Sequence, residues 1–250
     1  MLSKNHSENC FGFCHDCDRV HSLPTGNAIE LAQELLRDFE KFKRLDFIND
    51  ESQADPQFGF DQLFPGDRGH MFGILECENE SGEQKILRAF SSLAGGIRKV
   101  PGWVSSMLDP KIFAEQVFPG QQKIKAMTAE MNGHGRETSA GAAIFEERKQ
   151  FSQNLMREIH DFYEFTNFRG ETRPLRDIFL KPDSIPGGVG ECCAPKLLNH
   201  AAKNGLKPLG LAEFYWGGPN SSGRKQPGEF FSCCEDKCQP ILGFMLCGVD

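Results

Sequence analysis

The sequence predicts a mixed α/β (α+β) fold, and three observations lead to this prediction. The chain has 250 residues, of which 39% are hydrophobic and 25% are charged, so it carries enough apolar material for a sizeable core. Apolar residues recur at helical spacing in segments 27–47 and 142–165, as they do in helices that pack on a core. Two apolar runs, 71–77 and 85–90, flank a Ser-Gly turn, which is the pattern of a β-hairpin.

The N-terminal half is expected to combine helices with this hairpin. Leu35 and Phe39 lie on one side of the helix predicted at 27–47. Residues 49–69 are rich in Asp, Pro, Gly and Gln, a composition typical of a loop. Residues 91–121 contain Gly-Gly and Pro-Gly pairs and are expected to be irregular.

The last third of the chain is expected to alternate short elements. Residues 165–168 and 175–180 have the composition of short strands, and Gly205 fits the left-handed position that ends a helix. The other expected elements are a turn at 185–190, a helix at 192–204, a strand at 206–216, a loop at 217–228 and a helix at 234–246. The predicted organisation is a Cys/His-rich, zinc-knuckle-like lead-in at 1–25, helices and a hairpin at 26–165, and a zinc-binding core at 166–250. The last two segments are expected to form one compact unit.

Charge and targeting signals narrow the class of protein. With 28 Lys and Arg against 35 Asp and Glu, the net charge is −7, which disfavours a protein that holds a duplex mainly by phosphate contacts. No apolar run approaches the ~20 residues that span a bilayer, and the first residues lack the apolar core of a signal peptide. The sequence therefore predicts an intracellular, cytoplasmic protein without a membrane partner.

The chain has ten cysteines, and because cytosolic thiols are kept reduced, disulfides are not expected to explain them. Their clustering indicates metal binding instead. Pro195 and Pro240 are tolerated only in a first helical turn, which places Cys192 and Cys238 at helix starts where thiolates are favoured. We expect these two and Cys234 to converge on one zinc ion. Three ligands leave an open, catalytic type of site, whereas a fourth thiolate, from Cys193 or Cys233, would close it into a structural one.

The lead-in carries a second candidate zinc site. Cys10, Cys14, Cys17 and His21 fall within twelve residues, a spacing that suits a small closed knuckle. A flexible tail with scattered thiols is the alternative for this segment.

Several segments resemble the N-terminal extension of long RluA-type RNA pseudouridine synthases. The similar segments are Gly190-Glu191-Cys192-Cys193-Ala194-Pro195-Lys196-Leu197-Leu198, Gly205-Leu206-Lys207-Pro208-Leu209, Ala212-Glu213-Phe214-Tyr215-Trp216-Gly217 and the run from Phe231 to Leu242. The catalytic Asp motif of the synthases is absent from these 250 residues, so the resemblance does not imply pseudouridine synthesis. It implies an association with RNA modification, with RNA or an RNA-modifying enzyme as partner.

A fainter similarity links the C-terminal half to the zinc-dependent nucleobase deaminases. Their core is a hairpin, a helix that begins with (His/Cys)-Ala-Glu, a strand, and a helix that begins with Cys-x2-Cys. Here Cys192 stands at the first motif and Cys234 and Cys238 stand at the second, with three residues between them instead of two, so the order of elements and the ligand types agree. The general acid/base Glu of that family does not match, because Ala194 stands at its position. Glu191 and Glu213 are the two candidates for a displaced substitute.

Three functions remain open from the sequence. The leading hypothesis is a noncatalytic, zinc-binding accessory or RNA-binding module, in which Tyr215 and Trp216 stack a base and Arg224 and Lys225 contact phosphate. Ordinary packing of the aromatic residues and a solvated turn are the alternatives for these four positions. The second hypothesis is a zinc-dependent hydrolase or deaminase, and the third is a structural zinc protein whose helix at 142–165 docks a partner. The number of zinc ligands discriminates among them.

Overall fold

The structure is a computed structural model that describes residues 10–48, 50–64, 69–91, 99–219 and 223–249. Residue contacts divide the chain into two compact units. Unit 1 takes its residues from Met1–Met107, Phe165–Arg173 and Asp177–Asp250, and unit 2 from Leu108–Glu164 and Pro174–Arg176. The described part of the lead-in thus belongs to unit 1 together with the C-terminal segment.

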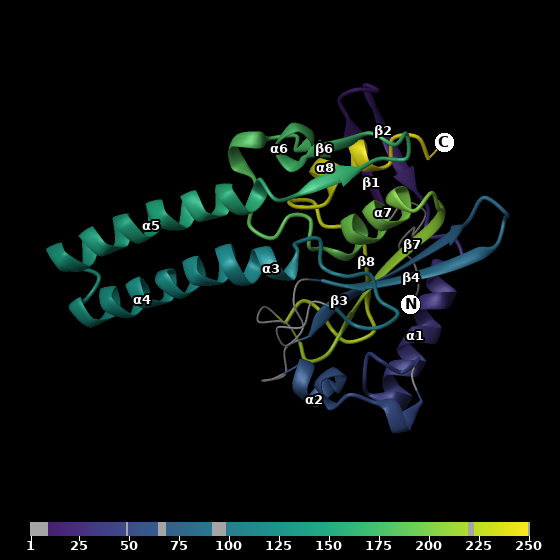
Figure 1. Ribbon diagram of the computed structural model, residues 1–250, viewed down its shortest axis with the longest axis horizontal. Coiled ribbons are helices and arrows are strands. Elements are labelled where there is room, and N and C mark those ends of the chain that lie inside the picture. Colours follow the sequence, from purple (N-terminus) through teal and green to yellow (C-terminus); the bar gives the residue numbers. More distant parts are fainter. Residues whose placement is uncertain (1–9, 49, 65–68, 92–98, 220–222, 250) are drawn as a thin grey trace. The chain divides into compact units, whose positions relative to one another are not determined.

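The described residues form helices and antiparallel strands, which makes the fold a mixed α/β one (Figure 1). The strands are β1 (Cys10–Cys14), β2 (Arg19–Leu23), β3 (His70–Glu78), β4 (Gln84–Phe90), β5 (Glu164–Thr166), β6 (Thr172–Pro174), β7 (Lys207–Trp216) and β8 (Phe230–Phe231). The α-helices are α1 (Ala28–Phe42), α2 (Phe60–Leu63), α3 (Pro110–Ile112), α4 (Phe118–His134), α5 (Ser139–His160), α6 (Leu175–Ile178), α7 (Cys193–Lys203) and α8 (Gln239–Met245). Shorter helical turns are η1 (Glu51–Gln53), η2 (Pro56–Phe58), the π-helical η3 (Phe113–Val117) and η4 (Pro182–Ser184).

The main sheet of unit 1 has the strand order β4-β3-β7-β8 in the described part of the chain, and its strands pair antiparallel. The central strand β3 lies between its hairpin partner β4 and the distant β7. Phe72 is opposite Phe90 on one side and Phe214 on the other, while Gly73 is opposite Glu213. Because side chains alternate along a strand, Phe72 and Phe214 point to one face and Glu213 points to the other.

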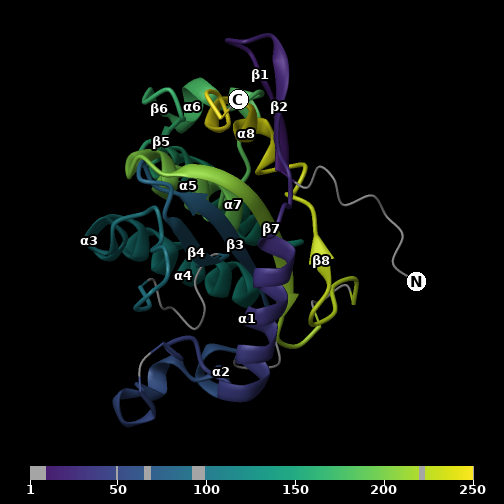
Figure 2. The same cartoon turned by 90° about the vertical axis from the view of Figure 1, so that its right-hand side faces the viewer.

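The helix α1 covers the first face of the sheet with an aromatic cluster (Figure 2). Phe39 is fully buried, and its ring centroid lies 4.8 Å from that of Phe72 and 5.1 Å from that of Phe60. Trp103 stacks on Phe39, with ring centroids 6.1 Å apart, and its indole N–H donates to the carbonyl of Leu45 at 2.9 Å. Such aromatic packing stabilises the contact between α1 and the sheet.

The helix α7 packs on the opposite face, directly over Gly73. A Cβ at Gly73 would lie 2.6 Å from the Cβ of Cys193 and 3.1 Å from the side chain of Leu197. Glycine is therefore needed here so that the first turn of α7 can approach the sheet. This close approach brings the start of α7 next to Glu213 on the neighbouring strand.

The hairpin formed by β1 and β2 crosses the C-terminal helix α8 at another pair of glycines. A Cβ at Gly12 would lie 2.6 Å from the carbonyl oxygen of Gln239, and a Cβ at Gly243 would overlap the backbone of Phe13. The N-terminal hairpin and the C-terminal helix are thus in backbone contact, although they are more than 200 residues apart in the chain.

Unit 2 consists mainly of the two helices α4 and α5. Gly135, with a positive φ of 79°, ends α4, and Thr138 caps α5 by accepting from the N–H of Gly141 at 3.0 Å. Gly120 lets the helices approach, because a Cβ there would lie 2.6 Å from the side chain of Leu155. None of the helices among the described residues is both long and apolar enough to cross a membrane.

The structure corrects several predicted elements. Residues 175–180, predicted as a strand, begin with the helical turn α6, and the first helix ends at Phe42 because Lys43 turns left-handed at φ 50°. Of the stretch predicted to be irregular, 91–121, residues 92–98 lie outside the described residues, and the chain is helical from Pro110 onward through α3, η3 and the start of α4. The first turn of α4 accommodates Pro119 and Gly120. Proline and glycine ordinarily indicate a break, but at a helix start and at a close helix contact they are compatible with a helix. The last helix begins at Gln239 rather than 234, after a turn.

Candidate metal centre

Three cysteines from two distant segments meet beside the main sheet. Cys192 is the residue before the first turn of α7, and Cys234 and Cys238 lie in the turn that leads into α8. Their sulfur atoms all lie within 4.8 Å of one another, close enough to hold a metal ion. The Sγ atoms of Cys234 and Cys238 are 3.2 Å apart. Cys238 is buried and Cys234 is exposed, so the cluster reaches the surface of unit 1 at Cys234.

The electrostatics of this cluster favour a thiolate at Cys234. Hydrogen bonds from the thiols of Cys192 and Cys238, together with backbone N–H groups, lower the pKa of Cys234 to about 2. The same hydrogen bond raises the pKa of Cys192 to about 12, because its proton is held between the two sulfur atoms. The three thiols therefore share charge around one point, as the ligands of a single cation would.

Cys193 and Cys233, each adjacent in sequence to one of these ligands, lie outside the cluster. The thiol of Cys193 is fully buried and donates to the carbonyl of Met71 at 3.3 Å. Cys233 lies beside Cys10, and this neighbour, followed by burial, raises the pKa of Cys233 well above its ordinary value. Among the described residues the cluster thus has three ligands, and neither paired cysteine adds a fourth.

Glu213 is the carboxylate that the fold brings to this site. It lies on β7 opposite Gly73, is only 5% exposed, and accepts from the N–H of Ala194 at 2.9 Å. Burial raises the pKa of Glu213 to about 7, against the lowering effect of the Ala194 N–H. The charge at Cys234 raises it further, which places this carboxylate within electrostatic reach of the cluster.

Glu191 has different partners. One carboxylate oxygen accepts from the hydroxyl of Ser106 at 2.8 Å, and the other lies 3.9 Å from the ammonium of Lys196, which is 1% exposed. Lys196 in turn donates to the backbone carbonyl of Phe90. The Glu191 carboxylate thus belongs to a buried ion pair with Lys196, although its neighbour in the sequence is Cys192.

The lead-in cysteines form a second cluster, with a different membership from the predicted one. Cys14, Cys17 and His21 lie within 4.8 Å of one another and of Cys247, which follows α8. Cys10 is at the far end of β1, four residues or ~13 Å of extended strand from Cys14, and its neighbour is Cys233. No sequence pattern marks Cys247 as a ligand, because it stands alone in the chain.

The four residues predicted to contact RNA are mostly engaged in packing. The hydroxyl of Tyr215, which is 4% exposed, donates to the carbonyl of Gly218 and accepts from the N–H of Gly69. The ring of Trp216 packs on Phe39 and Phe60. The ammonium of Lys225 lies 4.9 Å above the ring of Phe231, and Arg224 is exposed in the loop. In this structure the two aromatic side chains are engaged in packing and hydrogen bonds, and base stacking by them stays a prediction.

Comparisons with known proteins add no assignment: no family model, no curated protein and no solved structure matches this chain.

Proposed function

We propose that the protein is a zinc-dependent hydrolase of the deaminase type, with its metal held by Cys192, Cys234 and Cys238. The observation that carries the proposal is the ligand count. Structural zinc sites take four protein ligands, whereas catalytic ones take three and leave one position open. The cluster has three in the described part of the chain, and it reaches the surface at Cys234.

The donor set fits zinc. Thiolate sulfur is a soft ligand that selects zinc over magnesium or calcium. The low pKa of Cys234 supplies one thiolate, whereas the raised pKa values of Cys192 and Cys238 mean that a metal would have to displace their protons. When bound at such a site, zinc supplies an activated water at neutral pH.

Glu213 is the residue that we assign to proton transfer. The carboxylate accepts from the backbone of Ala194, the residue at the position where the deaminases carry their Glu. It therefore reaches the start of α7 from the neighbouring strand instead of from the helix itself. Its raised pKa of about 7 suits a group that takes up and releases a proton at neutral pH.

The order of elements supports an amino-substituted nucleobase as the substrate class. The hairpin β3–β4, the helix α7, the strand β7 and the helix α8 occur along the chain in the order of the deaminase core described above, with unit 2 inserted between β4 and α7 and the short strand β8 between β7 and α8. In the proposed reaction, water adds across the ring C=N bond: its oxygen forms a C–O bond to the carbon that bears the amino group, and Glu213 moves one of its protons to the ring nitrogen. Glu213 then carries the hydroxyl proton to the amino group, the C–N bond breaks as the C=O bond forms, and ammonia leaves.

The test is hydrolysis by the zinc-loaded protein. Cytosine, adenine and guanine nucleosides, mononucleotides and single-stranded RNA are incubated with it, and ammonia release is measured. We expect release from at least one of them, and Glu213→Gln should lower its rate by roughly 10²–10⁴-fold, since that is the usual contribution of a general acid/base. Zinc content should be unchanged in this variant, because Glu213 is not a ligand.

The matched variant is Glu191→Gln, which alters the other candidate carboxylate. A larger loss of rate in Glu191→Gln than in Glu213→Gln would transfer the proton-transfer role to Glu191. Bound zinc without ammonia release from any of these compounds would contradict the hydrolase, and RNA binding by the same protein would then support the noncatalytic accessory module.

A further inference from the structure

A second group of metal-ligating side chains joins the two ends of the described chain. The ligand atoms of Cys14, Cys17, His21 and Cys247 all lie within 4.8 Å of one another. The Sγ atoms of Cys17 and Cys247 are 3.2 Å apart, although 230 positions separate them in the sequence. Cys14, His21 and Cys247 are buried, and Cys17 is partly exposed. The composition, three Cys and one His, is that of a closed tetrahedral zinc site.

The hairpin presents its three ligands toward α8. Cys14 ends β1, Cys17 lies in the turn, and His21 lies on β2 opposite Gly12. Residues opposite one another in an antiparallel pair share a face, so His21 points to the same side as Gly12 and Cys14. This is the side on which Gly12 touches the backbone of α8. Cys247, just beyond the end of α8, completes the set from across that contact.

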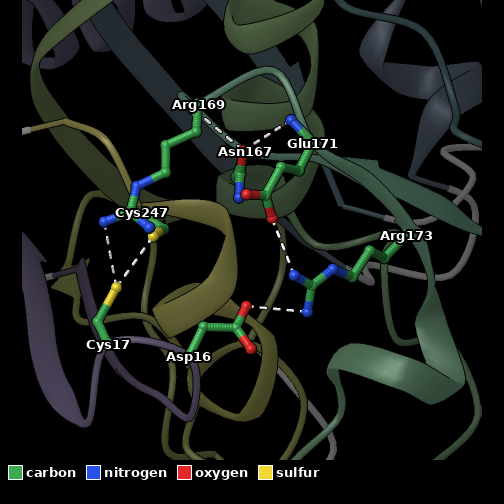
Figure 3. Close-up of polar contacts among 7 residues, drawn as sticks. All are labelled: Asp16, Cys17, Asn167, Arg169, Glu171, Arg173 and Cys247. Carbon is green, nitrogen blue, oxygen red and sulfur yellow. Dashed lines mark hydrogen bonds and ion pairs between the residues drawn. The ribbon is translucent and has the colours of Figure 1, made fainter.

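A loop after β5 contacts two residues of the cluster, Cys17 and Cys247 (Figure 3). The side-chain oxygen of Asn167 accepts from the N–H groups of Arg169 and Glu171, which shapes the loop. The guanidinium of Arg169 donates to the Sγ of Cys17 at 3.4 Å. The N–H of Phe168 donates to the carbonyl of Cys247 at 3.0 Å, so the loop also holds the C-terminal ligand in place.

A second arginine, Arg173 on the adjacent strand β6, forms an ion pair with the hairpin turn. Arg173 lies 2.8 Å from the carboxylate of Asp16, the residue between Cys14 and Cys17, and 2.9 Å from that of Glu171. The charges also balance, because three thiolates around a divalent cation carry one net negative charge, which Arg169 faces. The surroundings are therefore those of a metal site with its outer shell in place.

We propose that Cys14, Cys17, His21 and Cys247 bind a structural zinc ion that fastens the N-terminal hairpin to the C-terminal end of α8. The site is independent of the proposed hydrolase centre and shares no ligand with it. Its role is to stabilise the fold, because a two-stranded hairpin is too short to be stable alone and the metal joins it to the rest of unit 1.

The experiment measures zinc per chain in purified full-length variants. Cys247→Ser and Cys17→Ser are each expected to lose about one zinc ion relative to the wild type, because either change opens a four-ligand site. Cys10→Ser is the matched control, a buried cysteine of the same hairpin that lies outside the cluster, and it should retain the wild-type content. Loss of zinc in Cys10→Ser with retention in Cys247→Ser would overturn the proposal.

Two further variants keep the test decisive if Cys247→Ser does not fold. His21→Cys replaces one zinc ligand by another and should retain the metal, whereas His21→Ala should lose it. Zinc loss in both would contradict a ligand role for this position.

A Cys192→Ser background, which removes the hydrolase centre, separates the two sites. In this background the site formed by Cys14, Cys17, His21 and Cys247 should still hold about one zinc ion. The two centres can therefore fail separately: a protein without any zinc in that background refutes this site and leaves the other untouched.

Discussion

At the scale of single residues, two glycines set how closely β1 crosses α8. Neither Gly12 nor Gly243 needs a positive φ, so it is the missing side chain that matters. A Cβ on Gly243 would overlap the carbonyl of Phe13, which is backbone and cannot rotate away. This contact fixes the position of α8, and both cysteine clusters depend on it, because Cys238 precedes the helix and Cys247 follows it.

We therefore expect Gly243→Ala to destabilise the protein by about 3 kcal/mol or more, at the upper end of the usual cost of overpacking. The free energy of unfolding is measured by denaturant titration. Gly133→Ala is the matched control, since Gly133 lies in α4 with no atom within 4 Å of an added Cβ. It should leave stability unchanged or raise it, because alanine favours a helix more than glycine does. Equal effects of the two substitutions would contradict the close-contact argument.

At the scale of elements, α1 shows how a pattern in the sequence becomes packing. Its buried residues, among them Ala32, Leu35 and Phe39, follow the helical period and cover one face of the main sheet. The helix stops where Lys43 turns left-handed, and the chain folds back so that the N–H of Phe60 donates to the carbonyl of Lys43. The turn delivers Phe60 to the same aromatic cluster as Phe39.

Substitution of Phe39 tests this cluster. Phe39→Ala is expected to cost about 3–5 kcal/mol of unfolding free energy, because it removes a fully buried ring at the centre of the contacts. Phe42→Ala, three residues further along the same helix, removes a ring that is 37% exposed and should cost much less. The comparison is made by denaturant unfolding of both variants, and a loss of similar size in Phe42→Ala would show that α1 packs by another face.

At the scale of the whole molecule, α8 connects the two candidate metal centres. The helix has seven residues and a length of ~10 Å, with Cys238 before it and Cys247 after it. The segments that supply the ligands include the first described strand and the last described residues. Metal binding would therefore link parts of unit 1 that lie near opposite ends of the described sequence. Unit 2 contributes no ligand to either cluster among the described residues.

Removal of metal should accordingly loosen unit 1 selectively. We expect a chelator to increase amide hydrogen exchange in β1, β2 and α8, because their mutual contacts depend on the ligands at their ends. Peptides from α4 and α5 should keep their exchange rates. Mass spectrometry of the exchanged protein, before chelation and after zinc is restored, gives the comparison. An increase confined to α4 and α5, or none anywhere, would contradict a structural role for metal in unit 1.

Much of the local structure was predictable from the sequence by itself. Apolar periodicity predicted α1 and α5, apolar runs on either side of a Ser-Gly turn predicted β3 and β4, and Pro195 predicted the start of α7. The cysteine clustering predicted that Cys192, Cys234 and Cys238 converge, and the structure brings their sulfur atoms together. The signals for the elements are local, because each depends on residues close together in the sequence. The signal for the cysteine cluster depends on two helix starts, each of which is itself recognised locally from its proline.

The tertiary structure alone decided which distant groups share a site. Cys247 joins the lead-in ligands in place of Cys10 because α8 crosses β1, and no pattern within either segment records that crossing. Glu213 lies under the first turn of α7 and accepts from the N–H of Ala194 because strand alternation directs it to that face, while Glu191 pairs with the buried Lys196. Local spacing determines which elements form and which way their side chains point, but only packing determines which side chains meet, because contacts between segments 200 residues apart leave no periodic trace in the chain.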